Sequence, residues 1–336
     1  MVFTPDFLEG IVITTRVRFA RNLKNYPFRI TNVDTAREIV KKVNRALVKC
    51  DTFNLFFASN FNQITLEAMK EKHLISNAFI ENRKFSAALI NEKQDISVMI
   101  HEEDVIREQC FMKGLCLQEA YKRLERIDDE LSKNLDFAFD SKLGYLTSCP
   151  TNLGTGLRAS VMMFLPALTE SGKINALMDE VVSLGLTIRG VYGEGSSAEG
   201  YNYQISNEVT LGVSEQEILR TVEETVLRIC KAERDEMEKV FGKKQLKTMD
   251  RANKSFGVLT NATLLDYKEF LSHVAQVKLG AMLGFINISE ISKIDELIVE
   301  VRPAVLCEKY DKKLSAIDRD LFRAEIVGKK LLKIKE

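Results

Sequence analysis

Residues 148–160 read SCPTNLGTGLRAS and carry the most specific pattern in the chain. Proline, asparagine and two glycines lie close together here, which is typical of a tight loop. An apolar run begins at Arg158, and we expect it to form a helix. Cys149 precedes the proline in a loop before that helix, a position that permits an activated thiolate, although a small buried hydrophobe is an equal reading.

Alternating and helical patterns flank this loop. Residues 11–19 alternate between apolar and polar, so we expect a half-buried strand with Arg16 and Arg18 on its polar face. Further strands are predicted at 85–90, 96–100, 186–189 and 203–211. Helices are predicted at 34–50, capped by Asp34 or Thr35, at 117–131, and after a capping box at Ser214. The fold class is therefore α+β, a mainly antiparallel sheet flanked by helices.

The strand pattern fades after about Glu233, and helical faces replace it. Two such faces are expected, one formed by Phe270, Val274, Val277 and Ala281 and the other by Leu314, Ile317, Leu321 and Ala324. We therefore divide the chain into a domain of strands and helices at 10–235 and a helical domain at 236–336.

Composition limits the classes of partner. The 336 residues have a formal net charge of zero, with 45% hydrophobic and 29% charged residues, which argues against nucleic acid or a membrane surface as the main partner. Six cysteines form no CxxC pair and three histidines lack ligand spacing, so we expect no structural zinc site. Without a leader-like start or a membrane-length apolar run, the cytoplasm is the expected compartment.

Charged residues supply the chemistry. The chain has no GxxxxGK[ST] motif and only half matches to GxGxxG, so a nucleotide's phosphates have to be held in another way. Arginine is the natural alternative, because its planar fork binds phosphate oxygens bidentately. Taken singly each arginine is more often a solvated surface residue, and they gain weight only as a set: Arg16, Arg18, Arg107, Arg158 and Arg189. Glu103 and Glu194 are the acidic candidates.

Four motifs in order resemble a known family. They are TTRVR at 14–18, EED at 102–104 with Arg107, CPTNLGTGLRAS at 149–160, and RG at 189–190 with GE at 193–194. Together they resemble the catalytic domain of the phosphagen kinases, the arginine and creatine kinase family. RDLFRA at 319–324 is similar to the RDxxRA motif of the bacterial McsB-type protein arginine kinases, where it binds phosphoarginine. The resemblance then covers nearly the whole chain.

The resemblance implies roles for individual residues. ATP contacts fall on Thr14, Thr15, Arg16, Val17, Arg18, His73, Arg107, Arg158, Ala159, Ser160, Val161, Met162, Arg189, Gly190, Val191, Tyr192, Gly193 and Glu194. Glu103 and Glu194 hold the acceptor guanidinium, and Cys149 lies beside it. Phosphoarginine binding falls on Arg319, Asp320, Leu321, Phe322, Arg323 and Ala324, which could equally be an exposed helix face. Mg²⁺ accompanies ATP, with no protein ligand assigned.

The implied activity is ATP-dependent phosphorylation of arginine side chains on proteins. The resemblance also implies a zinc-finger activator, delivery of targets to the Clp protease and a homodimer. Two alternatives remain open: a kinase for free arginine, and a phosphoarginine-binding adaptor with weakened activity. The adaptor is considered because His101 and Val105 depart from the Asn-Glu-Glu-Asp-His pattern common in the family.

Overall fold

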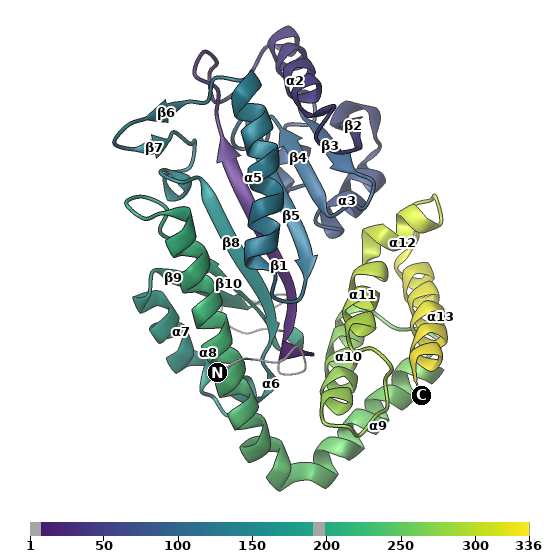
Figure 1. Ribbon diagram of the computed structural model, residues 1–336. Coiled ribbons are helices and arrows are strands. Elements are labelled where there is room, and N and C mark those ends of the chain that lie inside the picture. The colour runs from purple at the N-terminus through teal and green to yellow at the C-terminus, as the bar shows by residue number, and fades with distance from the viewer. Residues whose placement is uncertain (1–7, 191–198, 336) are drawn as a thin grey trace.

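The computed structural model describes residues 8–190 and 199–335, and its centre is one eight-stranded sheet (Figure 1). The strand order is β2-β3-β4-β5-β1-β8-β10-β9, and every neighbouring pair is antiparallel. The strands are β1 (Val12–Arg21), β2 (Phe53–Phe57), β3 (Ala87–Asn91), β4 (Ile96–Ile100), β5 (Ile106–Lys113), β8 (Leu157–Phe164), β9 (Leu186–Gly190) and β10 (Asn202–Asn207). A separate hairpin joins β6 (Phe139–Asp140) and β7 (Gly144–Tyr145).

One face of the sheet is covered by long helices, because alternate residues of the strands are apolar. Val17, Ala159 and Val161 point to this face and are fully buried in the main core. The helices on it are α2 (Val33–Leu47), α5 (Leu117–Asn134), α7 (Ile174–Ser183) and α8 (Glu215–Phe241). On the opposite face α3 (Gln63–Glu71) and α4 (Asn77–Glu81) cover the end of the sheet formed by β2, β3 and β4, and the face of the central strands carries polar side chains.

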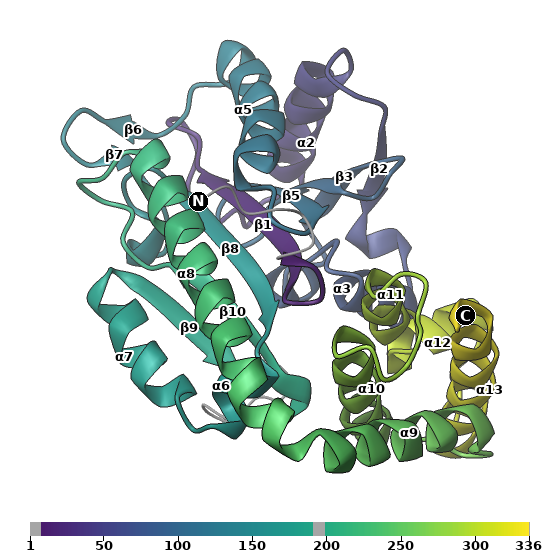
Figure 2. The same cartoon turned by 60° about the horizontal axis from the view of Figure 1, so that its bottom comes forward.

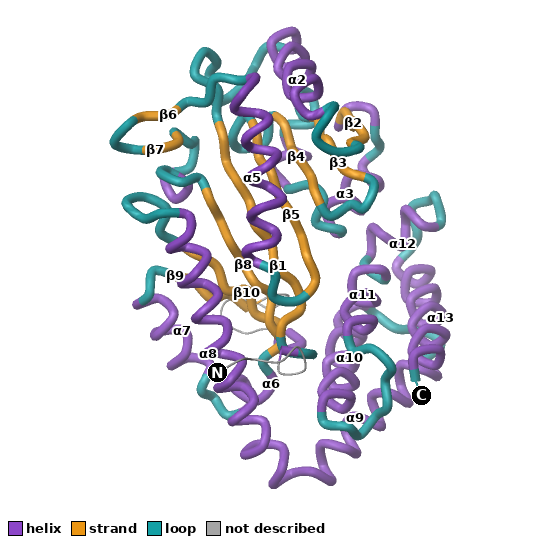
Figure 3. The backbone as a smooth tube through the Cα atoms, viewed as in Figure 1, coloured by secondary structure: helices purple, strands orange, loops and turns teal. Residues whose placement is uncertain are grey.

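Beyond α8 the described chain is helical and forms its own apolar core. Its helices are α9 (Gln245–Asn261), α10 (Tyr267–Met282), α11 (Ser292–Glu300), α12 (Pro303–Lys309) and α13 (Ala316–Ile334). Shorter segments are α6 (Pro166–Glu170), η1 (Ala58–Asn60), η2 (Pro150–Asn152), η3 (Glu199–Tyr201) and η4 (Gly242–Lys244). We call α9 to α13 the helical domain. Figure 3 shows it beside the sheet, and Figure 2 shows α9 leading into it from α8.

The expected fold class is confirmed, and most predicted elements appear near their expected positions. The capping box is present, with the Ser214 hydroxyl accepting from the Glu217 backbone N–H. The division at residue 235 stays a prediction, and α8 runs unbroken across that point.

Some local expectations were wrong. The run after Arg158 is the central strand β8 and not a helix, because its apolar residues alternate with Arg158, Ser160 and Met162 in the two-residue period of a strand. Helix α2 is capped by Asn32, whose side-chain oxygen accepts from two backbone N–H groups.

The face expected for the last helix was partly wrong. Leu314 and Ala324 are buried as expected, whereas Ile317 and Leu321 are 69% and 42% exposed. The buried face of α13 runs instead through Arg323, Ala324 and Val327. The strand expected at 203–211 ends at Asn207.

Candidate active site

Strand pairing gathers the predicted arginines on the open face of the sheet. Arg16 and Arg18 occupy alternate positions of β1, and Arg18 lies directly opposite Arg158 on β8. Arg107 on β5 lies opposite Ala20, and Arg189 on β9 lies opposite Gln204. Side chains directly opposite one another on antiparallel strands share a face. Five arginines far apart in sequence are therefore brought to one surface.

These arginines line one cavity, which we call the arginine cavity. It encloses about 330 Å³, and its remaining walls come from the loops around Glu103 and Cys149. The lining residues are Arg16, Arg18, Phe19, Ala20, Glu103, Arg107, Cys149, Thr151, Asn152, Gly156, Arg158, Arg189 and Gln204. The cavity thus combines a cationic floor with one carboxylate and one thiol.

Burial, and after it mutual repulsion, perturbs the guanidinium groups. Burial, followed by the charges of Arg107 and Arg158, lowers the pKa of Arg16 to about 10. Burial and the neighbouring arginines also hold the pKa of Arg18 well below its usual value, and burial lowers that of Arg158. Within the described residues, the buried Nε atoms of Arg18 and Arg158 find no hydrogen-bond partner. Such a cluster is suited to a multivalent anion whose oxygens supply the missing partners.

Arg107 is held by two carboxylates. Its Nη1 donates to Glu102 Oε1 at 2.6 Å, and its Nη2 donates to Glu103 Oε2 at 3.0 Å. The Glu102 side chain is 1% exposed, whereas that of Glu103 is 43% exposed. Glu102 also accepts from the Ser76 hydroxyl and from the Glu103 backbone N–H. Glu102 therefore holds Arg107 from the buried side, and the Glu103 carboxylate stays accessible from the cavity.

A buried polar network ties the Glu103 turn to the Cys149 loop. Asp104 is fully buried, and its Oδ1 accepts from Asn22 Nδ2 and from the Ser148 backbone N–H, each at 2.7 Å. Asn22 in turn accepts from the Val105 N–H at 2.8 Å. These contacts join the end of β1, the β4–β5 turn and the segment before Cys149. Sequence reasoning missed Asn22 and Ser76 as positioning residues, because their partners are distant in sequence, and it gave Glu102 no role although Arg107 is only five residues away.

The glycines of the Cys149 loop are required by close backbone contacts. Gly154 has φ +112°, and a Cβ there would lie 2.2 Å from the Thr210 carbonyl oxygen. Gly156 has φ +65°, and a Cβ there would lie 2.6 Å from the Ala20 oxygen. A side chain at either position would push the loop off the sheet. The glycines thus let Cys149 approach the cavity, where its Sγ lies 3.0 Å from Thr151 Oγ1.

The two family departures lie in the core and do not line the arginine cavity. His101 is 2% exposed, and its Nε2 lies 3.1 Å from the Ala36 carbonyl oxygen of α2. Val105 is fully buried. Both side chains thus point away from the cavity that Glu103 and Arg107 line.

The remaining predicted nucleotide residues divide between surface and core. Thr14, His73 and Met162 line a second hollow at the end of the sheet, next to the helical domain. Thr15, Val17, Ala159 and Val161 point into the core, so they shape the strands and leave contact with a ligand to their neighbours. Ser160 is 3% exposed and donates to the Arg16 carbonyl oxygen, and Gly190 ends β9. Val191, Tyr192, Gly193 and Glu194 lie outside the described residues.

The 319–324 motif begins one turn into α13. Arg323 is 1% exposed, and its guanidinium donates to the carbonyl oxygens of Val301 and Leu265 and to Asp320 Oδ1. Arg319 and Phe322 are half-buried, Leu321 is exposed and Ala324 is buried. Phe322 stacks on Tyr310 with ring centroids 3.9 Å apart. Arg323 thus has an internal structural role, while Arg319 is the member of the arginine pair nearer to solvent.

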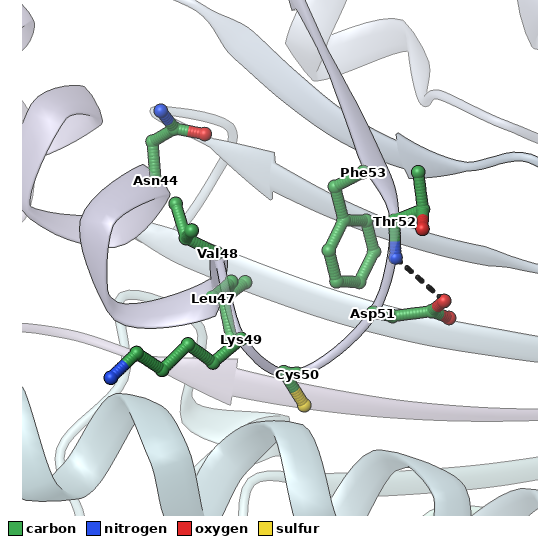
Figure 4. A pocket seen from close by; sticks show the side chains of 8 residues that line it. All are labelled: Asn44, Leu47, Val48, Lys49, Cys50, Asp51, Thr52 and Phe53. Carbon is green, nitrogen blue, oxygen red and sulfur yellow. Dashed lines mark hydrogen bonds between the residues drawn. The ribbon is translucent and has the colours of Figure 1, made fainter.

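Other surfaces offer less convergent chemistry. Figure 4 shows a hollow between the end of α2 and β2, where the main polar contact is the Thr52 N–H donating to Asp51 Oδ1 at 2.7 Å. In residues 8–190 and 199–335, no group of three or more His, Cys, Asp or Glu side chains is arranged to hold a metal ion. No described helix is long and apolar enough to cross a membrane.

Comparisons with known proteins agree with this geometry. Residues 35–236 match the family model of the ATP:guanido phosphotransferase C-terminal catalytic domain, and residues 245–336 match that of the protein-arginine kinase McsB C-terminal domain. The chain is 38% identical to a protein-arginine kinase of Caldanaerobacter subterraneus, covering 97% of this chain and 98% of that protein. It is 43% identical to a protein-arginine kinase of Clostridium kluyveri, covering 96% and 95%.

Two solved structures resemble the catalytic part. The duplicated taurocyamine kinase of Schistosoma mansoni, solved with transition state analog components, aligns at a TM-score of 0.61 and 29% identity. That alignment covers 69% of this chain and 34% of the duplicated enzyme. A lombricine kinase aligns at a TM-score of 0.58 and 25% identity, covering 67% and 66%.

Proposed function

The chain belongs to the protein-arginine kinases within the ATP:guanido phosphotransferase family, and from that premise we propose how its own residues phosphorylate arginine side chains of proteins. The observation that carries the proposal is the arginine cavity, where five guanidinium groups face Glu103 and Cys149 across one space. A triphosphate has the charge to pair with the arginines of the cavity, and a cationic acceptor has the charge to pair with Glu103.

The arginine cluster binds and orients the triphosphate. Arg16, Arg18 and Arg158 lie on adjacent strands, so their donors form a fixed surface that needs no rearrangement when charge moves onto the transferring group. Phosphoryl transfer depends mainly on such positioning and charge stabilisation. Mg²⁺, when bound with ATP, adds positive charge at the phosphate oxygens. Among the described lining residues only Glu103 carries a carboxylate and Arg107 already binds it, so the phosphates and water are the fitting ligands.

The acceptor has to lose a proton. A free guanidinium has a pKa above ~12 and is a poor nucleophile. In the proposed step an N–P bond forms between an acceptor nitrogen and the γ-phosphorus, and the bond from that phosphorus to the bridging oxygen of ADP breaks. The nitrogen's proton passes to a carboxylate, which we assign to Glu103. By resemblance Glu194 is the second carboxylate, and Cys149 adds negative character beside the cation.

A competition assay tests the substrate class. The protein is incubated with ATP, casein and free arginine, and phosphoarginine is measured by mass spectrometry without acid, because N–P bonds are acid-labile. We expect phosphorylated arginine in casein, and its loss in Glu103→Gln. Glu92→Gln, an exposed glutamate in the β3–β4 turn, is the matched control and should retain activity. Phosphoarginine found only as the free amino acid, and not in casein, would favour a phosphagen kinase.

The adaptor alternative predicts a different result. A phosphoarginine-binding adaptor would bind phosphorylated casein but transfer no phosphate from ATP in the same assay. Equal activity of the wild type and Glu103→Gln would refute the assigned mechanism.

The finer biological role rests on resemblance alone. We propose that residues 319–324 bind phosphoarginine, that the protein works as a cytoplasmic homodimer, and that a zinc-finger partner activates it before targets reach the Clp protease. Phosphorylation replaces a cation by an anionic group, which alters recognition of the target. Activity measured with and without added phosphoarginine tests the first of these proposals.

A further inference from the structure

The second hollow lies between the end of the sheet and the helical domain. It encloses about 180 Å³, the space of roughly six water molecules at ~30 Å³ each. On the sheet side it is lined by Ile13, Thr14, His73, Phe111, Lys113, Met162 and Asn202, and on the helical side by Ser292, Asp295, Glu296, Ile298, Val299 and Arg302. In Figures 1 and 2, α11 lies opposite the ends of β1 and β5. We call this space the interdomain hollow.

The interdomain hollow and the arginine cavity lie along the same strands. On β1, Thr14 lines the hollow and Arg16 lines the cavity, two residues and roughly 7 Å further on. On β10, Asn202 lines the hollow and Gln204 lines the cavity. A ligand with its phosphates on the arginines can therefore extend along the open face into the hollow.

The walls of the hollow suit a flat aromatic group. His73 and Phe111 stack with ring centroids 5.9 Å apart and planes 30° from parallel, and the Arg16 guanidinium lies 5.4 Å from the Phe111 ring centre. Val299 of α11 contributes an apolar side chain from the other side. Stacking of a nucleic-acid base on an aromatic side chain is worth about 1–3 kcal/mol.

One polar group in this hollow lacks a partner. Asn202 is 5% exposed, and its Oδ1 finds no hydrogen-bond partner among the described residues. A buried oxygen without a partner costs free energy unless a ligand or water completes it. An amino group on a heteroaromatic ring can donate to that oxygen.

The helical domain holds the other side of the hollow in place. Arg302 Nη1 lies 3.2 Å from His73 Nε2 and also donates to the Glu71 carbonyl oxygen. Burial, then the charges of Arg302 and Arg16, lowers the pKa of His73 to about 3, so its ring is neutral and Nε2 can accept from Arg302. His73 has φ +61°, a backbone conformation that bulky residues adopt only with support. Arg302 thus orients the ring that lines the hollow.

A second set of contacts fixes α12 to α3. Glu71 Oε2 accepts from the Ala304 and Val305 backbone N–H groups at 2.8 and 3.0 Å, which caps the first turn of α12. Lys72 pairs with Glu308 at 2.5 Å. We call these contacts the α3–α12 latch. They keep α11 facing the sheet.

We propose that α11 and Arg302 of the helical domain form the outer wall of the site for the nucleotide base, so that affinity for ATP depends on the seating of this domain. This inference rests on the proposed function for the identity of the nucleotide. It assigns to the helical domain a direct part in substrate binding, with Val299 in contact with the base and Arg302 as a positioning residue.

Calorimetric titration with two probes tests this wall. ATP carries a base, whereas inorganic tripolyphosphate presents a triphosphate chain alone. Val299→Trp fills the hollow and should weaken ATP binding by roughly 10- to 100-fold, since each 1.4 kcal/mol is a factor of ten. Tripolyphosphate affinity should stay within about twofold of the wild-type value, because a factor of two is only ~0.4 kcal/mol. Val258→Trp, on an exposed face of α9, is the matched control and should bind both probes normally.

Two further variants keep the test decisive. Ser292→Trp, at the start of α11, should reproduce the selective loss if Val299→Trp does not fold. Glu71→Gln weakens the α3–α12 latch and should also lower affinity for ATP more than for tripolyphosphate. Unchanged ATP binding in both tryptophan variants, or an equal loss of both probes in folded protein, overturns the proposal. Binding is measured without a protein acceptor, so this test does not depend on arginine phosphorylation. If the protein failed to phosphorylate arginine, only the proposed function would be refuted, and a selective loss of ATP binding in these variants would still support the wall.

Discussion

Replacing Arg16 by methionine should stabilise the protein without ATP and weaken its binding of ATP. Burial, followed by the charges of Arg107 and Arg158, lowers the pKa of Arg16 to about 10, which corresponds to a cost of about 3 kcal/mol for keeping the charge in the fold. Because the folded pKa lies below the unfolded one and this group is a cation, the cost is fully present below about pH 10 and is relieved only at higher pH. Loss of the contact with Phe111 offsets about 0.5–1 kcal/mol. We therefore expect a net stabilisation of about 1–3 kcal/mol at pH 7.5 for Arg16→Met.

Urea unfolding with and without ATP measures both effects. At 100 times its dissociation constant ATP should stabilise the wild type by about 2.7 kcal/mol, whereas a variant that binds 100-fold more weakly gains only about 0.4 kcal/mol. The difference in stability between Arg16→Met and the wild type should thus become smaller or change sign when ATP is added. Arg228→Met is the control, since that arginine is 56% exposed and pairs with Glu180 at the surface, and it should change stability by less than about 0.5 kcal/mol. If Arg16→Met unfolds at lower urea than the wild type without ATP, the reasoning about the cost of burying this charge among other arginines is wrong.

Three further outcomes are expected. Glu103→Gln should lower single-turnover phosphoarginine formation by roughly 10²- to 10⁴-fold, followed by ³¹P NMR, with ATP affinity changed only a few-fold; a normal rate would remove Glu103 as the base. His73→Asn should reduce the loss of stability on acidification. Burial, then the charges of Arg302 and Arg16, lowers the pKa of His73 to about 3, so the wild type loses stability as the pH decreases from about 6.5 toward 3. An equal decrease in the urea midpoint of both proteins between pH 7 and pH 4.5 would contradict this. Arg323→Ala should destabilise the helical domain by roughly 3 kcal/mol, because the buried carbonyl oxygens of Val301 and Leu265 and the part-buried Asp320 carboxylate lose their donor. Arg319→Ala should change thermal unfolding little and weaken only the response to added phosphoarginine.

The sequence was informative where local periodicity and a specific motif agreed. Alternation at 11–19 correctly placed Arg16 and Arg18 on the polar face of a strand, and the capping box at Ser214 marked the start of α8. The same reasoning failed at Arg158, because a buried central strand has an apolar run that also fits a helix. The strand pairings that bring Arg107, Arg158 and Arg189 together depend on register between distant segments, which no local pattern contains.

Positioning residues were the hardest to predict. Asn22, Ser76 and Glu102 act through partners on other elements, and their residue types are common at solvated turns. The interdomain hollow was equally hidden, since Arg302 and His73 are 229 residues apart along the chain. The charge of Glu102 beside Arg107 was the one available signal, and it could not be separated from an ordinary acidic turn.

The attachment of the helical domain at several places has a mechanical consequence. The α8–α9 connection holds one end of this domain, the α3–α12 latch holds the other, and Ala275 and Leu279 of α10 pack against Phe164 and Ala167 between them. A domain fastened in this way cannot swing freely, so an opening on the side of the latch has to break the contacts around Glu71. A substitution, a protease cut or a bound molecule at the α3–α12 latch would therefore change the interdomain hollow from a place that contacts no phosphate.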